Sequence, residues 1–173
     1  MNIYLIGYRC TGKTSVGKRL AQMLQRPFVD MDDEITKQLN MTISEIVKNK
    51  GWRFFREKEK AIIKAISRLN KRVVATGGGA VMCNQNILAM RQSGNVIWLK
   101  ARPRMIHKRI IADTRSNDFR PALTDKGLLD EIIVTIEKRN KYYKEAMDFY
   151  IDTDNLGVEG VTDRIIEHLD GQK

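Results

Sequence analysis

The octapeptide from Gly7 to Thr14, GYRCTGKT, matches the phosphate-binding pattern G-x-x-x-x-G-K-[ST]. In such a loop, backbone N–H groups and the start of the following helix converge on phosphate oxygens. The Lys13 ammonium would reach the β- and γ-phosphates of a nucleotide, and the Thr14 hydroxyl would ligate Mg²⁺. We therefore expect ATP and Mg²⁺ to bind here, on a set of loop residues made up of Gly7, Cys10, Thr11, Gly12, Lys13, Thr14 and Ser15.

Two aspartates follow the next apolar run, in the segment Phe28-Val-Asp30-Met-Asp32. Side chains two apart on a strand face the same way, so Asp30 and Asp32 would project together at the C-terminal edge of a sheet. One carboxylate could hold the hydrated Mg²⁺, and the other could accept the proton of an attacking hydroxyl. Read alone, this pattern is more typical of an N-cap; the phosphate loop one strand away favours the catalytic interpretation.

Further ligand-binding groups follow at Thr76-Gly-Gly-Gly79 and at three arginines. Three consecutive glycines let a ligand approach the backbone, although a flexible turn explains them about equally well in isolation. Guanidinium groups suit carboxylate or phosphate recognition. Arg56, Arg120 and Arg139 are therefore candidate substrate clamps, but spacing alone does not select them from the other arginines.

Short apolar runs, which alternate with segments of helical periodicity, would position these residues. The predicted strands are Asn2–Ile6, Pro27–Asp30, Arg72–Thr76, Asn95–Leu99 and Phe149–Asp152. The predicted helices are Thr14–Leu24, Trp52–Asn70, Asn84–Arg91, Arg102–Ile111, Leu128–Lys144 and Val158–Leu169. A capping box at Thr42–Glu45 predicts a further short helix that ends before Gly51. This alternation predicts an α/β fold in which helices cover both faces of a parallel sheet.

Length and composition narrow the class of protein. The chain has 173 residues, of which 42% are hydrophobic and 30% charged, as in an ordinary globular domain. We expect a single domain over residues 1–173, with no signal peptide or membrane span, in a reducing cytoplasm. The net charge of +10 indicates anionic partners. Nucleic acid is not expected, because no lysine tract or aromatic-interleaved basic strand is present.

Taken together, these residues resemble the shikimate kinase family, whose members transfer phosphate from ATP to the 3-hydroxyl of shikimate. The resemblance covers nearly the whole chain and rests on GYRCTGKT, FVDMD, FFREKE, TGGGAV, DFRPAL and EKRNKYY. It implies a three-layer α/β/α sandwich like that of P-loop nucleoside-monophosphate kinases, with a five-stranded parallel sheet in the order 2-3-1-4-5. It also implies a shikimate-binding insertion at residues 32–70 and a lid at residues 113–127. A monomer is the default expectation, because the sequence alone establishes no exposed apolar stripe.

The resemblance further implies a role for each matching residue. Lys13, Asp32 and Arg120 would be catalytic, with Asp32 at the shikimate hydroxyl and Arg120 on the lid. Thr14 and Asp30 would hold magnesium, and Arg109 would stack on adenine. The remaining shikimate-binding groups would be Arg56, Arg139, Gly77, Gly78 and Gly79.

The sequence leaves two alternative functions open, and at one position it departs from the family pattern. A nucleoside monophosphate or gluconate kinase shares the phosphate loop, the helical insertion and the lid. A P-loop module that binds nucleic acid through its basic surface belongs to a different class. Cys10 stands where the family often has a small residue, which predicts alkylation that ATP blocks, although an inert thiol is the simpler interpretation.

Overall fold

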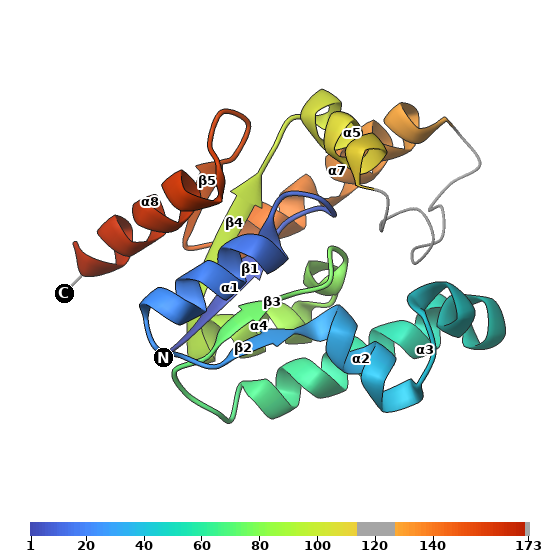
Figure 1. Cartoon of the computed structure of the whole chain (residues 1–173). Coiled ribbons are helices and arrows are strands. Elements are labelled where there is room, and N and C mark those ends of the chain that lie inside the picture. The colour runs from blue at the N-terminus through green and yellow to red at the C-terminus, as the bar shows by residue number, and fades with distance from the viewer. Residues whose placement is uncertain (114–126, 172–173) are drawn as a thin grey trace.

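The computed structural model describes residues 1–113 and 127–171 (Figure 1). Its five strands form one parallel sheet in the order β2-β3-β1-β4-β5. The strands are β1 (Asn2–Ile6), β2 (Phe28–Asp30), β3 (Val73–Ala75), β4 (Gly94–Lys100) and β5 (Phe149–Asp152). The predicted fold class and strand order are confirmed, and each predicted strand is found to within a residue or two of its ends.

Helices cover both faces of the sheet because successive strand residues point to opposite sides. The helices are α1 (Lys13–Met23), α2 (Met31–Leu39), α3 (Ile43–Ile66), the 3-10 turn η1 (Ala80–Met82), α4 (Asn84–Ser93), α5 (Pro103–Ala112), α7 (Leu128–Ala146) and α8 (Val158–Asp170). Ile3 and Leu5 of β1 pack with α1 and α8, whereas Tyr4 and Ile6 pack with α3, α4 and α7. In Figure 1, α1 and α8 lie together on one side of the sheet.

The segment between β2 and β3 contains two differences from the predicted helices. Helix α2 begins at Met31, directly after the strand, so Asp32 lies on a helix and not on the strand. Helix α3 has the predicted capping box at Thr42, bends at Gly51 (φ 78°, ψ 165°) and continues to Ile66, four residues before the predicted end. The apolar periodicity past Gly51 therefore overestimated the length of that helix.

Over the residues that the structure describes, no helix is long and apolar enough to cross a membrane. Gly7 and Thr76 directly follow the carboxyl ends of β1 and β3, and Asp30 is the last residue of β2. In a parallel sheet these ends lie at one edge, where ligands of such sheets bind. The fold therefore brings the three predicted motifs to the same edge.

Candidate active site

The phosphate loop is built by glycine conformations and one buried lysine. Gly7 and Gly12 have φ of 142° and 96°, and Cys10 adopts the left-handed region at 58°. A Cβ at Gly7 would overlap the Leu99 carbonyl oxygen, so only glycine fits between the loop and β4. The Lys13 ammonium donates to the carbonyl oxygens of Gly7 (2.9 Å) and Tyr8 (2.7 Å). The loop is thus folded around the Lys13 ammonium, the group that would bind a phosphate.

The start of α1 also suits an anion. Its N-cap, Gly12, offers no side-chain acceptor to the first-turn N–H groups, and the first turn contains no acidic residue. The positive end of the helix dipole therefore points into the loop, and no acidic residue of this first turn offsets it. Thr11 donates from Oγ1 to the Tyr8 carbonyl (2.9 Å), while Ser15 is exposed on the first turn.

Asp30 connects β2, α2 and the phosphate loop. Its Oδ2 accepts a hydrogen bond from the Thr14 hydroxyl at 2.7 Å. Its Oδ1 accepts from the backbone N–H groups of Asp32 (3.0 Å) and Asp33 (3.5 Å), which caps α2. Asp30 is therefore an N-cap and also contacts Thr14, so the two interpretations of this residue are compatible. An oxygen pair of this kind fits Mg²⁺ that keeps several waters and also binds phosphate.

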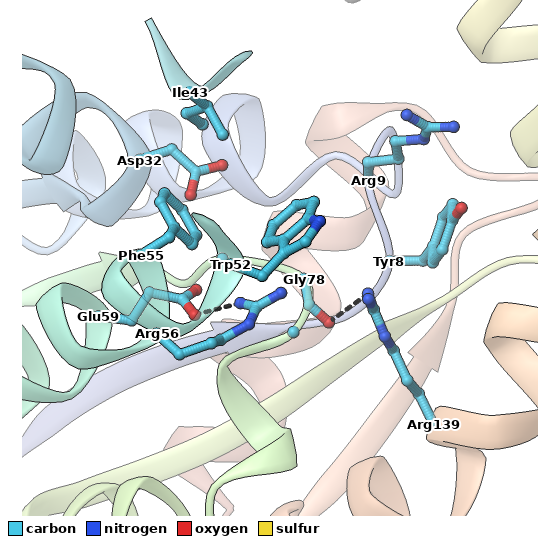
Figure 2. A pocket seen from close by; sticks show the side chains of 12 residues that line it. Tyr8, Arg9, Asp32, Ile43, Trp52, Phe55, Arg56, Glu59, Gly78 and Arg139 are labelled. Atoms are coloured by element: carbon cyan, nitrogen blue, oxygen red, sulfur yellow. Dashed lines mark hydrogen bonds and ion pairs between the residues drawn. The ribbon is translucent and has the colours of Figure 1, made fainter. Parts of the chain in front are cut away.

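A pocket next to this loop contains most of the predicted substrate residues (Figure 2). Asp32 lines it from α2, not from the end of β2, so the argument from strand alternation was wrong although the residue does reach the site. The first turn of α2 carries the side chain to the pocket instead. The pocket is lined by Tyr8, Arg9, Asp32, Ile43, Trp52, Phe55, Arg56, Glu59, Gly77, Gly78, Gly79 and Arg139.

The triple glycine lies against charged side chains. A Cβ at Gly77 would overlap the Glu59 carboxylate and come within 3.2 Å of Asp32 Oδ1. A Cβ at Gly79 would overlap the Arg56 guanidinium. A side chain at Gly77 or Gly79 would therefore displace the Glu59 carboxylate or the Arg56 guanidinium, so these two glycines pack against the pocket and are not simply a flexible turn.

Glu59 is a buried acid of the pocket that the sequence analysis missed. It has no exposed surface, and its Oε2 forms an ion pair with Arg56, one helical turn earlier on α3. Burial raises the pKa of Glu59 to about 7, although the Arg56 guanidinium lowers that pKa in part. In the sequence FFREKE, Glu59 follows Arg56 by three residues, a spacing that places the two side chains on one face of a helix. This pattern could have indicated the ion pair and hence Glu59.

Arg139 is buried beside the glycines and retains hydrogen-bonding capacity. Its Nη1 donates to the Gly78 carbonyl at 3.0 Å, as Figure 2 shows. Its Nε is buried and has no hydrogen-bond partner within the described part of the chain. Since buried polar atoms are normally paired, this donor is suited to an oxygen anion that enters the pocket.

The other predicted residues lie elsewhere at this edge. Arg109 donates from Nη1 to Thr153 Oγ1 (3.0 Å) and to the Cys10 carbonyl (3.5 Å), so it joins α5, the phosphate loop and the end of β5. Cys10 is partly buried against Tyr8 and the α5 and α7 side chains Ile106, Ile110 and Ile132. Arg120 and most of the predicted lid, at residues 114–126, lie outside the described residues.

One ion pair joins the phosphate loop to α7 and was not expected. Arg9 Nη2 lies 2.7 Å from Glu131 Oε1, with 13% and 2% of the two side chains exposed. Arg9 also lines the pocket. Helix α7 therefore contacts the phosphate loop near its first turn and the glycine loop through Arg139 near its last turns.

The chain is similar to known proteins over nearly its whole length. The family model for shikimate kinase matches residues 9–170. A shikimate kinase of Syntrophus aciditrophicus is 37% identical over 180 residues, which cover 99% of this chain and 92% of that protein. A shikimate kinase of Moorella thermoacetica is 39% identical, with 97% and 94% covered.

Solved structures agree with the sequence comparisons. The structure of shikimate kinase from Acinetobacter baumannii in complex with shikimate superposes with a TM-score of 0.92 at 29% identity, covering 99% of this chain and 94% of that one. Deoxyadenosine kinase from M. mycoides, at 14% identity and a TM-score of 0.64, shares the fold alone. On these matches, which span nearly its whole length, the chain belongs to the shikimate kinase family.

Proposed function

We propose that this chain transfers the γ-phosphoryl group of ATP to the 3-hydroxyl of shikimate in aromatic amino-acid biosynthesis. The observation that carries the proposal is a pocket beside the phosphate loop that combines two arginines with a carboxylate. Arg56 and Arg139 suit the carboxylate of a small acid, and Asp32 suits one of its hydroxyls. The Acinetobacter baumannii enzyme of the same fold is described in complex with shikimate.

In the proposed reaction, the acceptor hydroxyl oxygen attacks the γ-phosphorus and the bond from that phosphorus to the bridging oxygen of ADP breaks. Asp32 accepts the hydroxyl proton, so the substrate oxygen becomes the new phosphate ester. Lys13, which lies on the Gly7 and Tyr8 carbonyls, would turn toward the β- and γ-phosphates and stabilise their charge.

The nucleotide is proposed to bind along the loop from Gly7 to Ser15. Arg109 would stack on adenine, and its bonds to Thr153 and Cys10 support a base site at the end of β5. Arg120 would approach both substrates from the segment 113–127. Mg²⁺ would be held by Thr14 and Asp30, whose oxygens already lie 2.7 Å apart, and would neutralise phosphate charge when bound.

The oligomeric state, the binding partners and the cellular location are also proposals. We infer a monomer with shikimate and ATP as its partners and with no nucleic-acid or membrane partner. We also infer a cytoplasmic location. The two cysteines, Cys10 and Cys83, are not joined in a disulfide, as is usual in a reducing compartment.

A coupled ADP-release assay with ATP and Mg²⁺ tests the function. Shikimate, gluconate, AMP and no acceptor should be compared on the wild type, on Asp32→Asn and on Asp33→Asn. We expect turnover of the wild type to depend on shikimate. We expect it to fall by about 10² to 10⁴ in Asp32→Asn and to stay unchanged in Asp33→Asn. Asp33 is the matched control because it is exposed and does not line the pocket in Figure 2. Turnover with AMP or gluconate would overturn the substrate, and no turnover with any acceptor would overturn the kinase.

A further inference from the structure

Two side chains of α7 donate to the same carbonyl oxygen in the glycine loop. Tyr143 donates from its hydroxyl to the Gly78 oxygen at 2.6 Å, and Arg139, one turn earlier, donates to it from Nη1 at 3.0 Å. A carbonyl oxygen has two lone pairs, so both bonds can form together. The orientation of the Gly78 peptide is therefore set by one face of α7.

Tyr143 is itself held rigidly. It is 1% exposed, and its ring stacks on Trp98 of β4 with centroids 5.3 Å apart and an interplanar angle of 18°. Burial raises the pKa of its hydroxyl to about 12, so the group keeps its proton and acts as a donor throughout the neutral range. Tyr143 does not line the acceptor pocket, so it cannot act by touching the acceptor there.

Gly78 lies between the two halves of the site. A Cβ at this position would be 3.3 Å from the Gly7 carbonyl oxygen, 3.6 Å from the Arg9 nitrogen and 3.6 Å from Arg139 Nη1. The peptide that Tyr143 holds is thus packed against the phosphate loop on one side and against an acceptor-binding arginine on the other. A small rotation of this peptide would move the acceptor relative to the phosphate.

The two donors on Gly78 differ in what happens when the acceptor binds. A carboxylate that engages Arg139 competes with Gly78 for the donors of its guanidinium. Tyr143 faces no such competition because it lies outside the pocket. The tyrosine is therefore the donor that can keep the Gly78 carbonyl fixed throughout the catalytic cycle.

We propose that Tyr143 is a positioning residue for the acceptor: its hydroxyl fixes the Gly78 carbonyl and thereby sets the glycine loop and Arg139 for binding. The inference rests on the proposed function, since it assumes that the acceptor binds in the pocket of Arg56 and Arg139. It assigns to Tyr143 no contact with substrate and no part in proton transfer.

The test is Tyr143→Phe, which removes the hydroxyl and keeps the stacked ring. The KM for shikimate should rise about tenfold, the factor that one buried hydrogen bond is worth, while the KM for ATP changes less than about twofold. Tyr142→Phe is the matched control, because Tyr142 is the neighbouring, half-buried tyrosine and lies outside the pocket. In hydrogen–deuterium exchange without ligands, the peptide spanning Thr76–Met82 should exchange faster in Tyr143→Phe and not in Tyr142→Phe.

Several results would overturn the role of Tyr143. One is an unchanged KM for the acceptor together with unchanged exchange of the glycine loop. Another is an equal rise in the KM for both substrates, which would indicate a general loss of structure. The failure of the proposed function looks different: the wild type would then turn over another acceptor, and the KM of that acceptor in Tyr143→Phe would still decide whether the tyrosine positions the loop.

Discussion

The phosphate loop and the acceptor pocket lie side by side but are built in different ways. The loop occupies one short stretch of sequence, and its lysine is paired with carbonyls only five and six residues away. The pocket is assembled from α2, α3, the glycine loop and α7, and the bond between Arg139 and Gly78 spans 61 positions. It also contains buried polar atoms, Glu59 Oε1 and Arg139 Nε, that have no hydrogen-bond partner among the described residues.

This difference shows which half of the site depends more on contacts between distant segments, although Arg9 of the loop also pairs with Glu131 of α7. A loop whose shape comes from glycine conformations and local hydrogen bonds can form wherever a strand leads into a helix. The acceptor pocket exists only if α3 and α7 pack correctly, and it keeps donors and acceptors that a ligand can satisfy. Changes in the loop should therefore act on phosphoryl transfer, and changes in the pocket walls should act on acceptor binding and on stability.

The largest effect is expected in the phosphate loop. Lys13→Ala removes the cation held over the phosphate position, and kcat should fall by about 10² to 10³, as when one transition-state donor is lost. Lys18→Ala, an exposed lysine on the same helix, should leave kcat unchanged. Steady-state ADP release measures both variants, and circular dichroism checks that each is folded. A fall in kcat of less than about tenfold in Lys13→Ala would show that the Lys13 ammonium is not required for phosphoryl transfer.

The two regions also differ in how well the sequence predicted them. The strands and the phosphate loop were found because apolar runs and a contiguous motif reflect local physics, whereas the strand order was implied by the family resemblance. Asp32 does line the acceptor pocket, but the argument that placed it at this edge was wrong, because the strand ends at Asp30 and a helix begins at Met31. Glu59 and Tyr143 were missed, because their partners, Gly77 and Gly78, become neighbours only when α3 and α7 pack on the glycine loop.

The second prediction concerns the pH dependence of stability through Glu59. Its pKa is about 7 in the folded protein and 4.5 as the ordinary value, so the folded state holds this proton more tightly than the unfolded chain. The stabilisation from this group is complete below about pH 4.5 and is lost as the pH rises to about 7. This difference between the folded-state pKa and the ordinary pKa of Glu59 corresponds to at most about 3 kcal/mol of unfolding free energy.

Urea unfolding between about pH 5 and pH 8 measures this contribution. The wild type should lose stability relative to Glu59→Gln as the pH rises, because glutamine has no proton to release. Glu57→Gln, an exposed acid on the same helix, should follow the wild type. Parallel pH profiles for the wild type and Glu59→Gln would show that burial of Glu59 does not hold its proton.

The third prediction uses the close packing at Gly77. In Gly77→Ala the new Cβ overlaps the Glu59 carboxylate, so that side chain and its ion pair with Arg56 must move. We expect a loss of about 1 to 3 kcal/mol in stability and a higher KM for shikimate. Gly160→Ala, in α8 where the nearest atom is 3.4 Å away, should be neutral or stabilising. A wild-type KM for shikimate in folded Gly77→Ala would show that the pocket wall adapts to the extra methyl group.

The smallest effect is expected at the bend of α3, and it tests whether the two regions are separate. Gly51 has φ 78° and ψ 165°, a conformation open essentially only to glycine, although no atom lies within 4 Å of its Cβ position. Gly51→Ala should therefore cost about 1 kcal/mol through backbone strain, whereas Gly160→Ala, at a helical position of α8, should carry no such cost.

The bend at Gly51 directly precedes Trp52 and the turn that carries Arg56. Relief of the strain in Gly51→Ala should shift these pocket residues and raise the KM for shikimate a few-fold, as steady-state assays with each substrate varied in turn will measure. The KM for ATP should stay at the wild-type value, because Lys13 and its carbonyl partners lie within their own loop. Equal changes in both KM values would mean that the phosphate loop also depends on the packing of α3, and the contrast between a local site and an assembled one would then fail.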